Sequence, residues 1–262
     1  SYTDHDDGTC RLDAYFTAAQ ADDLSPLHLA YEHAGLALPT VTLDPVPAVD
    51  WQAQALADFP PRVVGGFVVY GHPSQRAGLP ADKRPLYIPA AAAFGTGEHA
   101  TTAGCLALFE ALPRQPRRRV LDMGAGTGIL AIVAAQLEQA QVVCIELDEF
   151  STQACQDNLA QNGVDHLAVA YQGDGFNGEE VGRRAPYDLI FANILLNPLL
   201  QMAPAVAAHL SPGGQAILSG FTTAQEATVL DAYAAHGLRL AARFERDGWV
   251  AVQLKAAPRR VG

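Results

Sequence analysis

The period of the hydrophobic pattern changes along the chain. Residues 10–16 alternate between apolar and polar side chains, which predicts a strand. Ser25-Pro26 then predicts the N-cap and the first turn of a helix that ends near Gly35. A second short strand is predicted over 40–43, a proline-rich linker over 44–51, a short helix near 50–58, a strand over 63–70 and a loop over 71–85.

From residue 118 onward, apolar strands alternate with helices. Strands are predicted over 118–123, 141–147, 167–171, 187–193 and 215–220, and helices over 129–137, before Asn162-Gly163, after Asn197-Pro198 and after the capping box Thr223-x-x-Glu226. Near-continuous apolar strands that alternate with helices predict a doubly wound, mostly parallel α/β sheet. Strands over 238–244 and 249–254, joined by the turn 245–248, predict a closing antiparallel hairpin, which is unusual for a nicotinamide-binding domain.

Composition limits the classes of partner. The 262 residues are 49% hydrophobic and carry a net charge of −11, which argues against a nucleic acid held by its phosphates and favours a basic partner. No apolar run is long enough to span a bilayer and no secretory signal is visible, so we expect a cytoplasmic protein, although Ser1 indicates an N-terminus that is processed or cut from something longer. The four cysteines form no C-x-x-C pair and the histidines show no metal-binding spacing, so reduced core cysteines and no metal site are expected.

A glycine-rich loop, LDMGAGTGIL, lies where the first strand of this sheet meets its helix. Gly124, Gly126 and Gly128 would let the backbone pass against a ligand, but Ile129 occupies the position of the third glycine in the dinucleotide fingerprint. A pyrophosphate on the helix N-terminus is therefore less expected. A tight turn that binds no ligand is the alternative.

Acidic residues surround this loop. Asp122 precedes it and can face a cationic ligand, and Glu146 ends the next strand, where a carboxylate can accept both hydroxyls of a ribose. A cationic adenosine ligand without phosphate points to S-adenosylmethionine. Asp174, beyond the third strand, is predicted to take the adenine amino group, and a solvated loop aspartate is the equal alternative.

A second glycine-rich stretch makes the resemblance specific. FGTGEHATT, LDMGAGTGILAI, FANILLNPL, LSPGGQAILSG and DGWVAVQL together resemble the ribosomal protein L11 methyltransferase (PrmA) family, from about Trp51 to Leu254. The departures are Thr127 for serine, Glu146 for aspartate and Asp247-Gly248-Trp249 for Gly-Glu-Trp, and none removes a needed functional group. The resemblance implies a class I S-adenosylmethionine methyltransferase fold, Rossmann-like, with a mostly parallel seven-stranded sheet ending in an antiparallel hairpin.

The resemblance also implies how the two glycine loops share one ligand. The second loop holds the adenosine and the methionine backbone, and the first lies across the methionine side. There Thr102 would contact the cofactor, with Thr101 beside it, and Phe94 would wall the sulfonium, a favourable place for a cation. Gly95 and Gly97 would let the loop close. Alternatively, Thr101-Thr102 only caps the following helix, and His99 braces the loop or accepts a proton.

Asn193 ends the fourth strand, where the methyl group should point, and Asn193-Ile194-Leu195-Leu196 distantly resembles the Asn-Pro-Pro-Tyr motif of amine methyltransferases. The side-chain carbonyl of Asn193 and a neighbouring backbone carbonyl, which we assign to Ile194, would accept the N–H groups of an amine and aim its lone pair. A structural strand-end residue is the alternative reading of Asn193.

These features predict an S-adenosylmethionine-dependent protein N-methyltransferase. The resemblance implies that it methylates lysine side chains and the N-terminal amine of large-subunit ribosomal protein L11, and we expect a bacterial, monomeric enzyme. Residues 1–47 would form a small substrate-recognition domain, about half of the ferredoxin-like domain that the resemblance implies. Residues 48–62 would be a linker with a short helix, and 63–262 the methyltransferase domain. The alternatives are a lysine methyltransferase of another protein, a nicotinamide oxidoreductase and a non-enzymatic cofactor-binding module.

Overall fold

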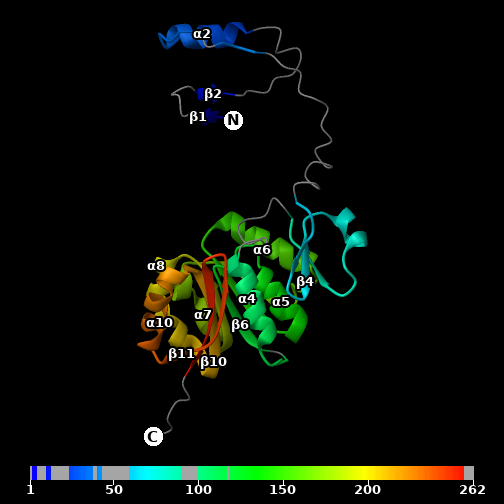
Figure 1. The fold of residues 1–262 in the computed structure, drawn as a ribbon, viewed down its shortest axis with the longest axis vertical. Helices are drawn as coiled ribbons and strands as arrows, with labels where there is room; N and C mark the ends of the chain where they lie inside the picture. Colours follow the sequence, from blue (N-terminus) through cyan, green and yellow to red (C-terminus); the bar gives the residue numbers. More distant parts are fainter. Residues whose placement is uncertain are drawn as a thin grey trace. The chain divides into compact units, whose positions relative to one another are not determined.

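The computed structural model describes residues 2–4, 10–12, 24–37, 40–42, 59–89, 100–116 and 118–256. The chain divides into two compact units, residues 1–50 and 51–262. In Figure 1 the described parts of the first unit are blue, and those of the second unit run from cyan through green and yellow to red.

The described residues of the first unit form a short hairpin and a helix. Strands β1 (Tyr2–Asp4) and β2 (Cys10–Leu12) pair antiparallel, and α2 spans Ser25–His33. The N-cap of α2 is Leu24 rather than the predicted Ser25, which is the first helical residue, while Gly35 has a positive φ of 66° just beyond the helix, as its C-terminal signal predicted. Residues 40–42 form no strand, so that prediction is wrong for these three positions. No residue of α2 is buried, which fits a unit too small to enclose a core of its own.

From residue 59, where the description of the second unit begins, the chain forms a three-stranded sheet in place of the single predicted strand. Gly65 and Gly66 split residues 63–70 into β3 (Arg62–Val64) and β4 (Phe67–Tyr70), which pair antiparallel. Gly65 has a φ of +59°, and the Gly66 amide donates to Glu110 Oε1 over 3.0 Å, so the turn is fixed by a helix 44 residues away. The segment predicted as loop contains the 3₁₀ helix η1 (Pro73–Gly78) and strand β5 (Arg84–Tyr87), parallel to β4. The predicted helix near 50–58 lies outside the described residues.

The main sheet has seven strands in the order β11-β12-β10-β9-β6-β7-β8. All neighbouring pairs are parallel except those of β12, which runs antiparallel to both β10 and β11. The strands are β6 (Arg119–Met123), β7 (Gln141–Glu146), β8 (Ala168–Gln172), β9 (Tyr187–Asn193), β10 (Leu210–Thr222), β11 (Leu238–Arg246) and β12 (Trp249–Ala256). The predicted α/β class, the mostly parallel order and the closing hairpin are confirmed.

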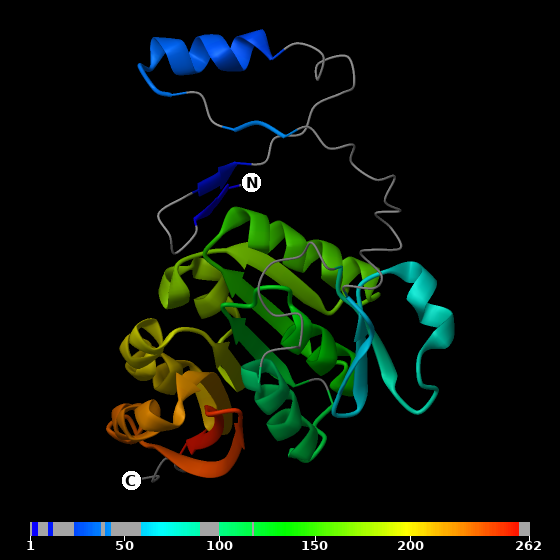
Figure 2. The same ribbon diagram turned by 45° about the horizontal axis from the view of Figure 1, so that its top comes forward.

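Helices cover both faces of this sheet because successive strand residues point to opposite sides. Val120, Val142 and Leu189 belong to a core cluster shared with α4 (Ala100–Ala111), α5 (Ile129–Glu138), α6 (Glu149–Gln161) and the three-stranded sheet. Their neighbours in sequence, Leu121, Val143 and Ile190, belong to a second cluster. Figures 1 and 2 show the helices of that second face, α7 (Glu179–Arg184), α8 (Leu196–Gln201), α9 (Ala203–His209) and α10 (Glu226–Ala234).

Two local predictions at the ends of elements need correction. The capping box before α10 is formed by Thr222 and Gln225, one residue earlier than predicted, around the 3₁₀ turn η3 (Thr223–Gln225). The final hairpin turns on Asp247 and Gly248 alone, both with positive φ, and Glu245 and Arg246 continue β11.

Candidate active site at the carboxyl edge of the sheet

The glycine loop between β6 and α5 has the backbone that the sequence predicted. Gly124, Gly126 and Gly128 have φ angles of +68°, +54° and +77°, a region that side chains with a Cβ rarely occupy. The amide of Gly124 donates to the carbonyl of Ile145 on β7 over 2.8 Å, which holds the loop against the neighbouring strand end. A larger residue at any of the three positions would strain the loop.

Two of these glycines also allow close packing. A Cβ at Gly124 would overlap Cγ2 of Ile194, and a Cβ at Gly128 would lie 2.7 Å from Sγ of Cys155 on α6. The loop is therefore packed between the segment after β9 and helix α6. The glycines are needed for contact with the protein itself as well as for any ligand.

Asp122 lies beneath the loop, where it is 1% exposed. Its Oδ2 accepts a hydrogen bond from the amide of Ala131 in the first turn of α5, over 3.1 Å. Burial raises the pKa of Asp122 to about 8; the hydrogen bond from Ala131 opposes this shift and the negative charge of Glu146 adds to it. The carboxyl group is thus held in a place where a nearby cation would favour its charged form.

Glu146 lies at the end of β7 with its carboxylate turned to the glycine loop. Its Oε2 accepts from the amide of Gly126 over 2.9 Å, and Oε1 accepts from the amide of Leu147 over 2.9 Å. The amide of Asp148 also donates to Oε1, over a long 3.5 Å. Of the roughly four acceptor positions of a carboxylate, one on Oε2 is therefore open to a ribose hydroxyl, and a second becomes available when the long bond from Asp148 is replaced. Asp174 is exposed just beyond β8, and the amide of Gly173 donates to the carbonyl of Glu146 over 2.9 Å, which brings both acidic residues to one edge of the sheet.

Asn193 ends β9, next to β6 in the sheet, and its Nδ2 donates to Oγ1 of Thr102 over 3.3 Å. Thr102 is 2% exposed and lies inside the first turn of α4, which begins at Ala100. The alternative in which Thr101 and Thr102 only cap this helix is therefore wrong. The two predicted site residues are brought together from positions 91 apart in sequence.

The close approach of Gly220 to Ile194 was missed from the sequence. Gly220, near the end of β10, has a φ of +97°, and a Cβ there would overlap the backbone of Ile194. Gly220 therefore lets β10 pass directly against the segment that follows Asn193. A glycine inside a strand is a sequence signal for such an approach, but it does not say which segment approaches. Phe94, Gly95, Gly97 and His99 lie outside the described residues, so their roles stay predictions.

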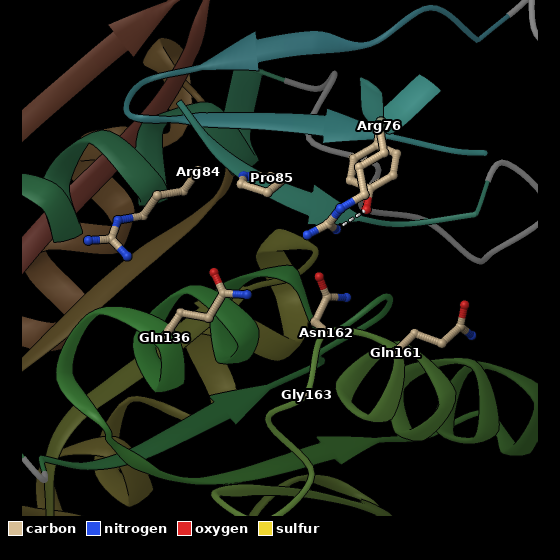
Figure 3. Close-up of a pocket in the computed structure, with 8 residues that line it drawn as sticks. Arg76, Arg84, Pro85, Gln136, Gln161, Asn162 and Gly163 are labelled. Atoms are coloured by element: carbon tan, nitrogen blue, oxygen red, sulfur yellow. Dashed lines mark hydrogen bonds between the residues drawn. The ribbon is translucent and has the colours of Figure 1, made fainter. Parts of the chain in front are cut away.

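A cavity of about 360 Å³ lies elsewhere in the unit and contains none of the predicted site residues. In Figure 3 the guanidinium group of Arg76 donates to the hydroxyl of Tyr70 over 2.8 Å and points toward Asn162. Arg76 lies near Asn162 at the C-terminal end of α6, and Arg84 lies near Gln136 in the last turn of α5. Helix C-terminal ends stabilise positive charge, so the cavity does not by itself call for a ligand. It is lined by Tyr70, Arg76, Arg84, Pro85, Gln136, Gln161, Asn162 and Gly163.

The chain matches the family model "Ribosomal protein L11 methyltransferase (PrmA)" over residues 2–257. The chain belongs to the ribosomal protein L11 methyltransferase (PrmA) family. The match begins in the first unit, whereas the sequence motifs carry the resemblance only from about Trp51 onward.

Individual PrmA relatives agree. A ribosomal protein L11 methyltransferase from Caulobacter sp. (strain K31) is 39% identical over 253 residues, which cover 96% of this chain and 85% of that protein. One from Rhizobium etli is 39% identical over 208 residues, covering 79% and 71%. A crystal structure of ribosomal protein L11 methylase from Lactobacillus delbrueckii subsp. bulgaricus has a TM-score of 0.66 and 25% identity, and covers 74% of this chain and 96% of that one.

PrmA membership and the seven-stranded sheet establish a class I methyltransferase that uses S-adenosylmethionine. The carboxyl edge fits this cofactor, because it joins a glycine loop, two carboxylates and a buried acidic group without the third glycine of a dinucleotide site. Within the described part of the chain, no three His, Cys, Asp or Glu side chains gather where they could hold a metal ion. No helix among those residues is long and apolar enough to cross a membrane.

Proposed function

We propose that this enzyme transfers methyl groups to amines of ribosomal protein L11, namely lysine ε-amines and the N-terminal α-amine. The placement of Asn193 carries the proposal. It ends the strand beside β6, at the edge that also carries the glycine loop, and its amide nitrogen is held by Thr102. That bond leaves the amide oxygen of Asn193 to accept an N–H group of the substrate.

The residues around the cofactor have separate proposed tasks. Glu146 accepts the ribose hydroxyls, Asp174 the adenine amino group, and the loop Gly124–Gly128 follows the adenosine and methionine backbone. Asp122, whose pKa is raised to about 8, becomes charged beneath the loop when the cationic cofactor binds beside it. We assign Thr101, Thr102, Phe94 and Gly95 to the methionine side of the cofactor. The bound cofactor supplies an electrophilic methyl group on a sulfonium.

Asn193 and the carbonyl of Ile194 orient the acceptor amine rather than deprotonate it. An asparagine is no base at neutral pH, so the amine must arrive neutral. Neutralising a free lysine at pH 7 costs about 4.6 kcal/mol, from its pKa of about 10.4, and an α-amine about 1 kcal/mol. A neighbouring positive charge lowers both costs. Two carbonyl acceptors that hold the N–H groups then point the nitrogen lone pair at the methyl group.

Two observations support L11 as the substrate protein. The printed names of the relatives support L11, and the net charge of −11 suits a basic protein partner. We further propose that residues 1–47 recognise this substrate, joined by a linker over 48–62 to the methyltransferase domain over 63–262. We also propose that the enzyme acts as a cytoplasmic monomer without direct contact to nucleic acid.

The test is methyl transfer from S-adenosylmethionine to purified L11, read by intact mass and by peptide mapping. We expect mass increases of one or more methyl groups, located on lysines and on the N-terminal amine. A second small basic ribosomal protein serves as the control for charge alone. No transfer to L11, with transfer to the control, would assign the enzyme to another protein substrate. Binding of NAD without S-adenosylmethionine would point to a different enzyme class.

A further inference from the structure

Helix α6 begins soon after the end of β7, contains Asn158 in its last turn and is followed by Asn162 as its C-cap. Its N-cap is Asp148, whose Oδ2 accepts from the amide of Ser151 over 2.7 Å. Asn158 and Asn162 follow at a spacing of four, which places them one above the other on the helix surface. We call these two residues the asparagine pair.

The first member of the asparagine pair holds the glycine loop after β6. Nδ2 of Asn158 donates to the carbonyl of Thr127 over 3.0 Å, and both residues are almost fully buried, at 2% and 0% exposure. Thr127 lies between Gly126 and Gly128, so the bond acts inside the glycine loop itself. This bond between a buried amide and a buried carbonyl fixes the position of the glycine loop relative to α6, because a buried carbonyl without a donor is costly.

The second member holds strand β5. Oδ1 of Asn162 accepts from the amide of Tyr87 over 3.0 Å, and Nδ2 donates to the carbonyl of Tyr87 over 2.8 Å and to that of Asn158 over 2.8 Å. The side chain of Asn162 therefore bonds Tyr87 as a neighbouring strand would. Tyr87 is the last residue of β5, and the chain after it leads to the sequence FGTGEHATT.

We propose that the asparagine pair is a positioning device that sets the second glycine loop and the strand leading to the first in a fixed relation, through one helix. The path runs from Thr127 through Asn158 and Asn162 to Tyr87. This path of hydrogen bonds joins two segments that are about 40 residues apart in sequence. Strand pairing does not connect them, because β5 belongs to the three-stranded sheet and the glycine loop follows a strand of the main sheet. The inference rests on the proposed placement of the cofactor between the two glycine loops. Neither asparagine is proposed to touch the cofactor.

The experiment compares Asn162→Ala with Gln156→Ala. Gln156 lies on the same helix, and its Oε1 accepts from the amide of Ala170 on β8 over 3.0 Å, so its removal takes away a similar bond that does not reach either glycine loop. Affinity for S-adenosylhomocysteine is measured by calorimetry at a temperature where melting curves show each variant folded. Asn162→Ala removes all three side-chain hydrogen bonds of Asn162. We expect it to weaken binding about threefold to tenfold, because part of their combined contribution supports stability rather than the alignment of the site. Gln156→Ala should lower Tm but leave the affinity unchanged.

A second ligand separates positioning from general loosening. 5′-Methylthioadenosine lacks the amino and carboxylate groups of methionine, so it should bind wild type and Asn162→Ala equally well if the lost alignment concerns the methionine side. Asn158→Ala should weaken both ligands, since it releases the loop that we place along the adenosine. If Asn158→Ala does not fold, Asn162→Ala decides alone, because Asn162 is only half-buried.

Three outcomes overturn the inference: unchanged affinity for S-adenosylhomocysteine in Asn162→Ala, an equal loss for both ligands in that variant, or an equal loss in Gln156→Ala. Failure of the proposed cofactor site is recognised separately with Glu146→Ala. If Glu146→Ala weakens S-adenosylhomocysteine and Asn162→Ala does not, the site stands and the positioning role falls. If Glu146→Ala also binds normally, the placement of the cofactor is wrong.

Discussion

Asn193 donates a hydrogen bond to Thr102 across 3.3 Å, and this contact joins the end of β9 to the first turn of α4. Thr102 is buried and Asn193 is partly buried. The bond engages the amide nitrogen of Asn193 and leaves its amide oxygen able to accept another hydrogen bond. An asparagine held in this way can accept a substrate N–H without first reorganising, which is the property that positioning an amine requires.

Replacing Asn193 with alanine should therefore affect turnover rather than cofactor binding. We expect Asn193→Ala to lower kcat for L11 by about a hundredfold or more, the scale seen when a transition-state contact is lost. Affinity for S-adenosylmethionine should stay within a few-fold. Asn197→Ala, an exposed asparagine in α8, is the control. Turnover near that of wild type would make Asn193 a structural strand-end residue.

Glu146 should have the opposite profile. In the proposed site, Glu146→Ala removes a charged acceptor from the ribose hydroxyls, worth about 1.5–3 kcal/mol per hydrogen bond, and it also leaves the amide of Gly126 without this acceptor. We expect S-adenosylmethionine to bind at least about tenfold more weakly in calorimetric titration. Glu149→Ala removes an exposed carboxylate three residues later and serves as the control for charge. Equal dissociation constants for wild type and Glu146→Ala would contradict the assignment.

Asp122 should make stability depend on pH. Its folded pKa of about 8 lies above the value of 3.8 expected in the unfolded chain, because burial disfavours the charged form. A group with a raised folded pKa contributes stability that is complete below about pH 4 and is lost as pH rises toward 8. Asp122→Asn cannot ionise, so its Tm should fall less than that of wild type between pH 5 and 8.5. Parallel Tm curves for the two proteins would contradict a raised pKa.

Gly220 offers a test of close packing with a matched control. Gly213→Ala and Gly220→Ala both place a Cβ at positive φ, which costs roughly 1–2 kcal/mol. Only at Gly220 does the new atom meet the backbone of Ile194, whereas nothing lies within 4 Å at Gly213. We expect both variants to lose Tm and only Gly220→Ala to lose additional kcat. If the two lose kcat equally, the approach to Ile194 does not position Asn193.

The first unit should matter for the protein substrate and not for the cofactor. Residues 1–47 belong to the first unit, whereas both glycine loops belong to the second. The two core clusters of the second unit contain only its own residues. Deleting them should leave affinity for S-adenosylmethionine nearly intact, while methylation of folded L11 collapses and that of lysine-containing peptides falls less. Methylation of folded L11 at the full rate by the shortened enzyme would reduce these residues to a packing role.

Local sequence pattern determined the main sheet of this protein and its glycine loop. Apolar runs such as 187–193 predict a buried strand wherever they lie in space, since a strand buried on both faces needs no particular neighbour to show that pattern. The positive φ angles at Gly124, Gly126 and Gly128 could likewise be expected, because only glycine adopts them readily. The position of Glu146 beside the loop could also be expected, because it ends a strand parallel to β6 and the carboxyl ends of parallel strands share one edge of the sheet.

Only the tertiary structure decided which distant segments meet. The contacts of Thr102 with Asn193 and of Asn158 with Thr127 join residues far apart in sequence, and neither changes the local hydrophobic period. The turn at Gly65-Gly66 looked like the middle of one strand, because the side chain that fixes it, Glu110, belongs to a separate helix. Hydrophobic periodicity indicates which face of an element is buried. It does not indicate which element packs against that face, because any apolar surface would suit it equally. The packing partner is determined by strand order and by the shape of the packed core.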